Sequence, residues 1–139
     1  MSKRPRLFFL ISLAQHKLKK MADSSFKDTL DISMTQLGVL FLLEEHPGAM
    51  LKELSDQLGV NASAITALVD RMEAAGLVQR KPSISDERAQ LLFATAAGLK
   101  RAAAARPILG RLNTRLLQGF EEREIEVVGR FLKSIVDRF

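Results

Sequence analysis

Hydrophobic positions in the middle of the chain recur at spacings of three and four, a pattern that predicts two short helices. Their apolar stripes are Leu51, Leu54 and Leu58 in the first helix, and Ile65, Leu68, Val69 and Met72 in the second. Gly59 should end the first helix, because glycine readily adopts the left-handed backbone of a helix C-terminus. Asn61 is suited to cap the second helix, expected from Ala62 to Ala75. Two helices joined by so short a turn are typical of a helix-turn-helix.

The polar face of the second helix is suited to approach DNA. At about 100° per residue, this face lies opposite the apolar stripe. Its centre carries Ser63, Ala67, Asp70 and Ala74, and Thr66 and Arg71 lie on its flanks. Short side chains let the helix come close to base edges, where hydroxyl groups donate or accept hydrogen bonds. Only one arginine is present on this face, so most phosphate contacts must come from elsewhere.

Two strand-like runs follow this helix and predict a β-hairpin. They are Leu77–Lys81 and Ala89–Ala94, and the loop between them is longer than a two-residue turn. The candidate DNA-contacting residues here are Arg80, Lys81, Ser83, Asp86 and Arg88. A basic hairpin beside a reading helix is well placed to contact the phosphate backbone or the minor groove. Asp86 is close enough in sequence to hold the guanidinium of Arg88 in one orientation.

The residues from Ser63 to Arg80, with Asp86-Glu87-Arg88 and Thr95-Ala96-Ala97-Gly98, resemble the MarR (multiple antibiotic resistance regulator) family. The resemblance implies a winged helix-turn-helix in which Arg88 reaches the minor groove. It also implies a homodimer that binds a pseudo-palindromic double-stranded DNA operator, most commonly as a repressor. In family members, small aromatic acids can bind between the dimer helices and the winged domain, so Phe8, Ser12 and His16 are candidate ligand-binding residues.

The two ends of the chain carry further amphipathic patterns. We expect helices at Leu7–Asp23, Leu37–Glu45 (capped by Ser33), Ala96–Gln118 and Glu122–Asp137, with a loose turn and part of a helix at Asp23–Ile32. The candidate dimer-interface residues are Leu7, Ile11, Leu18, Leu112, Leu116, Ile125, Val128, Leu132 and Ile135. These stripes alone would equally suit an intramolecular bundle, so the expectation of a dimer rests partly on the family resemblance.

The predicted fold is therefore mainly α-helical with a small β-hairpin wing. We expect a winged helix-turn-helix DNA-binding domain at residues 33–98. A helical dimerisation domain is expected from the N-terminal helix (1–32) and the C-terminal helices (99–139). An adaptor winged helix that binds only protein remains the alternative, and Arg88 together with the Ser63 and Thr66 face argues against it.

Composition narrows the function further. The 139 residues carry a formal net charge of +5, which suits a polyanionic partner such as DNA. The absence of cysteine excludes disulfides and the thiol-based peroxide sensors of the family. His16 and His46 lack ligand-like neighbours, so no metal site is expected. No catalytic arrangement or cofactor motif is visible, and we expect a DNA-binding protein, not an enzyme.

The N-terminus imitates a short secretory signal, with basic residues before an apolar run. The apolar stripe, however, continues as one helical face through any cleavage point into a lysine-rich stretch. We therefore expect a cytoplasmic protein with no membrane association, because no apolar run approaches the roughly 20 residues of a membrane span.

Overall fold

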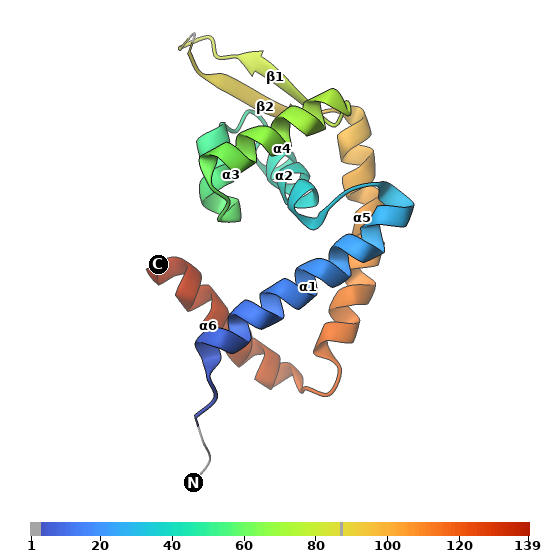
Figure 1. Cartoon of the computed structure of the whole chain (residues 1–139), viewed down its shortest axis with the longest axis vertical. Coiled ribbons are helices and arrows are strands. Elements are labelled where there is room, and N and C mark those ends of the chain that lie inside the picture. The colour runs from blue at the N-terminus through green and yellow to red at the C-terminus, as the bar shows by residue number, and fades with distance from the viewer. Residues whose placement is uncertain (1–3, 87) are drawn as a thin grey trace. The chain divides into compact units, whose positions relative to one another are not determined.

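The computed structural model describes residues 4–86 and 88–139 (Figure 1). Within them it has six helices and one two-stranded antiparallel sheet. The elements are α1 (Leu7–Leu30), α2 (Met34–Glu45), α3 (Leu51–Leu58), α4 (Ala62–Ala74), β1 (Val78–Pro82), β2 (Gln90–Ala94), α5 (Ala96–Leu117) and α6 (Glu122–Arg138). The chain divides into two compact units, one ending at Ile108 and one spanning Leu109–Phe139. The predicted class, mainly α-helical with a β-hairpin wing, is confirmed.

The prediction that the first helix ends near Asp23 was wrong, because α1 continues to Leu30. The polar residues after Asp23 suggested a loose turn, but they occupy only the outer face of the added turns. On the inner face, Ala22 and Phe26 are one turn apart and both are buried. The helix ends instead at Asp31, which adopts a left-handed backbone with φ of 49°.

Helices α2, α3 and α4 form the core of the first unit together with the hairpin. Their largest fully buried side chains are Leu37, Leu40, Leu43, Leu54, Ile65, Met72 and Leu92. Three predicted helix boundaries are confirmed by their hydrogen bonds or backbone. Ser33 and Gln36 form a capping box, Gly59 is left-handed with φ of 63°, and Asn61 Oδ1 accepts from Ala64 N at 2.8 Å. Local sequence thus determines where α2 begins, where α3 ends and where α4 begins.

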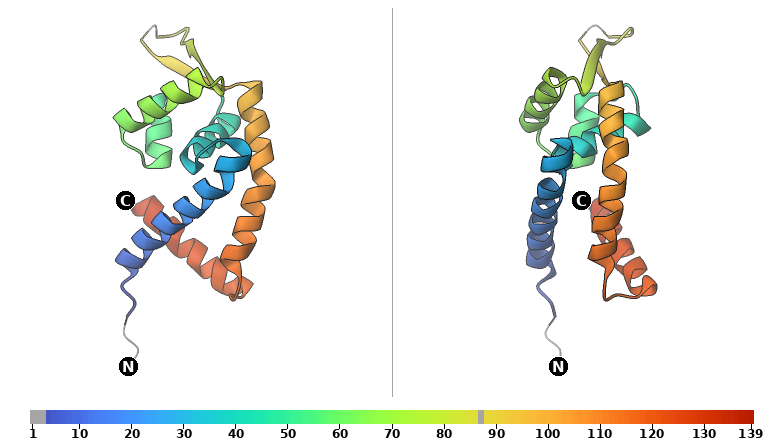
Figure 2. Two further views of the ribbon diagram at one scale, coloured as in Figure 1. Left: turned by 45° about the vertical axis from the view of Figure 1, so that its right-hand side comes forward. Right: turned by 90° about the vertical axis from the view of Figure 1, so that its right-hand side faces the viewer.

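The hairpin is tied to this core along its base. β1 pairs with β2 in a register that joins Val78 to Ala94 and Pro82 to Gln90. The loop before α3 adds one bridge, in which Leu92 N donates to Ala49 O at 2.9 Å. Figure 2 shows the far end of the hairpin projecting beyond α3 and α4. The base of the wing is therefore held against the helix-turn-helix while its tip is free of the helices.

The start of α5 packs closely against the turn that follows α4, at Gly76 and Leu77. Thr95 caps α5 by accepting from Gly98 N at 3.1 Å, and its hydroxyl donates to Gly76 O at 2.6 Å. A Cβ at Gly98 would lie 2.3 Å from the Leu77 carbonyl oxygen, so only glycine fits there. This close approach fixes the start of α5 against the winged segment. α5 then continues without a break across Pro107 into the second unit.

The second unit consists of the end of α5, a turn and α6. The turn contains Gly119 at φ of 88°, and Glu121 with Glu124 forms a capping box that starts α6. The predicted separation of two C-terminal helices, between Gln118 and Glu122, is confirmed. No residue of α6 is buried, although the helix contains several large apolar side chains. In the single chain, α6 therefore has an apolar face without a full set of packing partners.

Candidate nucleic-acid interface

The outward face of α4 carries five of the residues predicted from helical geometry. Ser63, Thr66, Ala67, Asp70 and Arg71 are all exposed, while Ile65, Leu68, Val69 and Met72 on the opposite face are buried. The split follows from helical periodicity, because the apolar stripe packs inward and leaves the remaining positions to solvent. A continuous polar helix face is thus available to a groove of DNA.

The two hydroxyl groups of this face are already oriented by local hydrogen bonds. Ser63 Oγ donates to Asn61 Oδ1 at 2.9 Å, and Thr66 Oγ1 donates to Ala62 O at 2.8 Å. Each hydroxyl has therefore used its single proton within the chain and keeps acceptor capacity outward. In this state the two hydroxyls are suited to accept from base amino groups.

Arg80 links the wing to α4. From strand β1 its Nη2 lies 2.6 Å from Asp70 Oδ1 and its Nη1 lies 2.9 Å from Glu73 Oε1. The pKa of Arg80 is raised, chiefly because its guanidinium donates a hydrogen bond to Asp70, and burial opposes this effect. Only 18% of the Arg80 side chain is exposed, so its guanidinium faces these carboxylates more than solvent. We call Asp70, Glu73 and Arg80 the helix–wing cluster.

This cluster alters the roles expected for Asp70 and Arg80. Both were predicted as DNA-contacting residues, and the structure pairs them with each other. Because a paired arginine has fewer free donors, we propose that Arg80 positions the wing on α4 and neutralises two carboxylates near the DNA face. Sequence reasoning missed Glu73, although its position three residues after Asp70 places both acids on one side of the helix.

The remaining wing cation of β1, Lys81, lies on the surface of the hairpin. Its Nζ is 5.1 Å from the centre of the Phe93 ring on the paired strand. Such a contact places a lysine over an aromatic face while leaving its ammonium group accessible to solvent. Lys81 thus remains available for a phosphate contact, which stays a prediction.

The loop beyond the strands is closed by backbone and side-chain hydrogen bonds. Ser83 N donates to Ala89 O at 3.0 Å, which adds one step to the hairpin. Asp86 Oδ1 accepts from the backbone N–H of Arg88 at 3.0 Å. The expectation that Asp86 holds the Arg88 guanidinium is thus replaced by a different contact, in which Asp86 shapes the backbone turn. The Arg88 residue itself is exposed near the tip.

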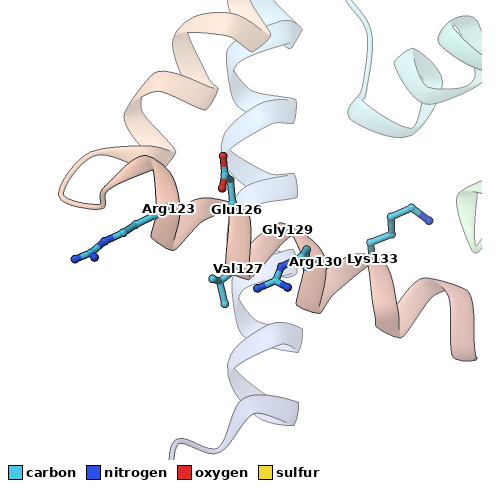
Figure 3. Close-up of a pocket in the computed structure, with 6 residues that line it drawn as sticks. All are labelled: Arg123, Glu126, Val127, Gly129, Arg130 and Lys133. Atoms are coloured by element: carbon cyan, nitrogen blue, oxygen red, sulfur yellow. The ribbon is translucent and has the colours of Figure 1, made fainter.

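The predicted ligand residues lie along one exposed side of α1. Phe8, Ser12 and His16 follow at intervals of four, and all three are exposed. Two of the hollows in the described chain are lined by other residues. One lies along α6, lined by Arg123, Glu126, Val127, Gly129, Arg130 and Lys133 (Figure 3), and the other by Leu42, His46, Ala49, Glu53, Leu54 and Gln57. Ligand binding by the three α1 residues therefore stays a prediction.

The predicted dimer residues keep exposed surface in the single chain. Leu7, Leu18, Leu116, Val128 and Leu132 are exposed, and Ile11, Leu112, Ile125 and Ile135 are partly exposed. Large apolar side chains that remain uncovered, here on α1, α5 and α6, are typical of interaction surfaces.

Over residues 4–86 and 88–139, no group of three or more His, Asp or Glu side chains could hold a metal ion. In the same residues, no helix has the length and apolar content needed to cross a membrane.

The fold and the exposed α4 face beside a basic hairpin define a winged helix-turn-helix protein. The sequence profile of the MarR family matches residues 32–89. The organic hydroperoxide resistance transcriptional regulator of Bacillus subtilis is 34% identical over 93 residues, which cover 67% of this chain and 63% of that protein. The transcriptional repressor IacR of Pseudomonas putida is 27% identical over 106 residues, covering 76% of this chain and 64% of that protein. The chain thus spans slightly less than two thirds of each of these two relatives.

A solved structure extends the likeness over the whole fold. A mutant MarR from E. coli, complexed with operator DNA, superposes with a TM-score of 0.85 at 25% identity, covering 93% of this chain and 92% of that chain. The chain belongs to the MarR family of winged helix-turn-helix, DNA-binding transcriptional regulators. The named relatives are regulators, not enzymes.

Proposed function

We propose that this protein is a cytoplasmic repressor that binds a pseudo-palindromic operator as a homodimer and is released by a small aromatic acid. The observation that carries the DNA-binding part is the exposed α4 face, flanked by a wing with Lys81 and Arg88 on its surface. α4 would enter the major groove, while the wing would contact the adjacent phosphates and minor groove. The relative crystallised on operator DNA supports the same use of this fold.

In this proposal residues 33–98 form the DNA-binding domain, and the segments 1–32 and 99–139 form the dimerisation domain. Support comes from the uncovered apolar side chains of α1 and α6. A two-fold dimer presents two α4 helices to half-sites about 34 Å apart, which is one turn of DNA. Repression itself is supported by the relative named a transcriptional repressor.

The DNA-binding proposal is tested at Arg88. We expect Arg88→Ala to weaken binding to a selected operator by about tenfold, because one guanidinium contact to the narrow minor groove is lost. Asp86→Ala should cause a smaller loss, since it loosens the turn that presents Arg88. Arg88→Lys should recover part of the affinity without the preference for narrow A·T-rich grooves.

The measurement is operator affinity as a function of salt for each variant, beside a circular dichroism melt. Lys52→Ala is a suitable control, because Lys52 is an exposed cation on α3, outside the wing and the α4 face. Wild-type affinity for Arg88→Ala would place the wing away from the DNA. Binding of the wild-type protein that does not fall with salt would favour a protein adaptor over a DNA-binding regulator.

Release by a ligand is tested with phenolic carboxylates titrated into the protein–DNA complex. Phe8, Ser12 and His16 supply an aromatic ring, a hydroxyl and an imidazole on one side of α1. We expect a bound carboxylate to release DNA, and Phe8→Ala with His16→Ala to reduce that response by about tenfold while leaving DNA affinity intact. If no such compound releases DNA or shifts the melting temperature, a regulator controlled in another way is preferred.

A further inference from the structure

The wing tip carries one large apolar side chain that nothing in the chain covers. Ile84 is fully exposed, more so than any other large hydrophobic residue of the described chain. It lies between two serines whose Oγ atoms are 3.1 Å apart. Single exposed apolar residues are common, so exposure by itself has little meaning. Ile84 differs from other exposed apolar residues because it lies at the hairpin tip at the level of Arg88.

Ile84 and Arg88 occupy equivalent places on the two sides of the hairpin tip. The last backbone pair of the hairpin joins Ser83 N to Ala89 O at 3.0 Å. Ile84 is the first residue beyond this pair on one side, and Arg88 is the first on the other. Because the backbone pair holds the two sides at a fixed separation, a tip that carries Arg88 into a groove carries Ile84 with it.

The minor groove offers an apolar side chain different surfaces at different base pairs. Its walls are formed by sugars, and at A·T pairs its floor presents only the adenine N3 and thymine O2 acceptors. At G·C pairs the guanine amino group projects as a donor. An isoleucine pressed against that amino group would remove it from water without giving it a hydrogen-bond partner, which is unfavourable.

We propose that Ile84 is a DNA-contacting, specificity-determining residue. It packs in the minor groove beside Arg88 and disfavours G·C pairs at the position contacted by the wing tip. This inference rests on the proposed DNA-binding function and deepens it. Arg88 supplies attraction to the phosphate-lined groove, and Ile84 supplies discrimination through shape and desolvation.

The test uses a duplex selected from a randomised pool, with the wing-contacted base pairs located by hydroxyl-radical footprinting. Three versions of this duplex carry A·T, inosine·cytosine or G·C at those pairs. Inosine lacks the amino group of guanine, so its pair with cytosine presents the minor-groove groups of A·T and the major-groove groups of G·C. Affinities are measured for wild type, Ile84→Ser, Ile84→Val and Arg88→Ala, and for the double variant Ile84→Ser with Arg88→Ala.

For wild type we expect similar affinity for the A·T and inosine duplexes and about tenfold weaker binding to the G·C duplex, the scale of one unfavourable base pair. Ile84→Ser should reduce this discrimination several-fold without changing the salt dependence, because no charge is altered. Ile84→Val should retain most of it. In the Arg88→Ala background, Ile84→Ser should still reduce the discrimination, which separates its effect from that of the arginine.

Two results would overturn this role. One is unchanged discrimination in Ile84→Ser while Arg88→Ala still weakens binding, which would leave DNA binding by the wing intact and remove Ile84 from it. The other is equal binding of all three duplexes by the wild-type protein. If Arg88→Ala also has no effect on affinity, the proposed use of the wing fails, and the inference about Ile84 fails with it. A circular dichroism melt verifies that each variant is folded.

Discussion

Leu132→Asp combined with Ile135→Asp is expected to convert the protein to a monomer and to weaken operator binding at least a hundredfold. Both residues lie on the apolar side of α6, where no residue is buried in the single chain. If this side closes a dimer, each substitution places an unpaired carboxylate in an apolar interface, which costs several kcal/mol per ionised group. A monomer then engages one half-site at a time and loses the benefit of linked binding.

The measurement combines analytical ultracentrifugation with operator affinity. Arg130→Asp is the matched control, because two residues along a helix turn the side chain by about 200°, away from Leu132. That control also adds a carboxylate to α6, so general charge effects on DNA binding appear in both variants. A double variant that remains dimeric and binds the operator normally would reject this interface.

Arg80→Gln is expected to reduce operator affinity by about ten- to a hundredfold with only a small loss of stability. The substitution leaves Asp70 and Glu73 unpaired beside the face of α4 that we propose to enter the groove. The two acids are exposed, so the ion pairs themselves contribute only about 1 kcal/mol or less each to folding. The larger effect is on DNA, since two freed negative charges repel it and the wing loses a contact to α4.

A triple variant distinguishes this positioning role from a direct phosphate contact. Asp70→Asn, Glu73→Gln and Arg80→Gln together remove the whole helix–wing cluster without leaving unpaired charge. If Arg80 acts by neutralising and positioning, the triple variant should recover much of the affinity lost in Arg80→Gln. If Arg80 instead contacts phosphate, affinity will stay low and the slope of log affinity against log salt will fall by about 0.9.

Asp70 shows which part of the site the sequence pattern predicted and which part it did not. Helical periodicity placed Asp70 on the outer face of α4, and the structure agrees. The pattern contained no information about which cation lies opposite, because Arg80 reaches Asp70 only after the chain turns at Gly76 and begins β1. A residue predicted to touch DNA is therefore found paired within the protein.

The end of α1 was likewise not predictable from the local sequence. Polar residues after Asp23 reduced the visible amphipathic signal, so the sequence predicted a loose turn there. Phe26 is nevertheless fully buried, and its burial favours a helix through this segment. Packing against the rest of the first unit outweighs weak local preference, and packing partners are not readable from the segment itself.

The sequence alone determined the helix-turn-helix, its caps and glycine turn, the wing, and the outward face of α4. These features depend on local rules: side-chain periodicity, hydrogen bonds over three or four residues, and the backbone freedom of glycine. Only the tertiary structure decided that Arg80 binds Asp70 and Glu73, that Asp86 shapes the backbone at Arg88, and that the Ser83–Ala89 pair leaves Ile84 and Arg88 as the next residue on each side of the wing tip. Each of these depends on the positions that separate segments take when the hairpin folds back beside α4, and the short-range pattern of side chains along the sequence does not encode those positions.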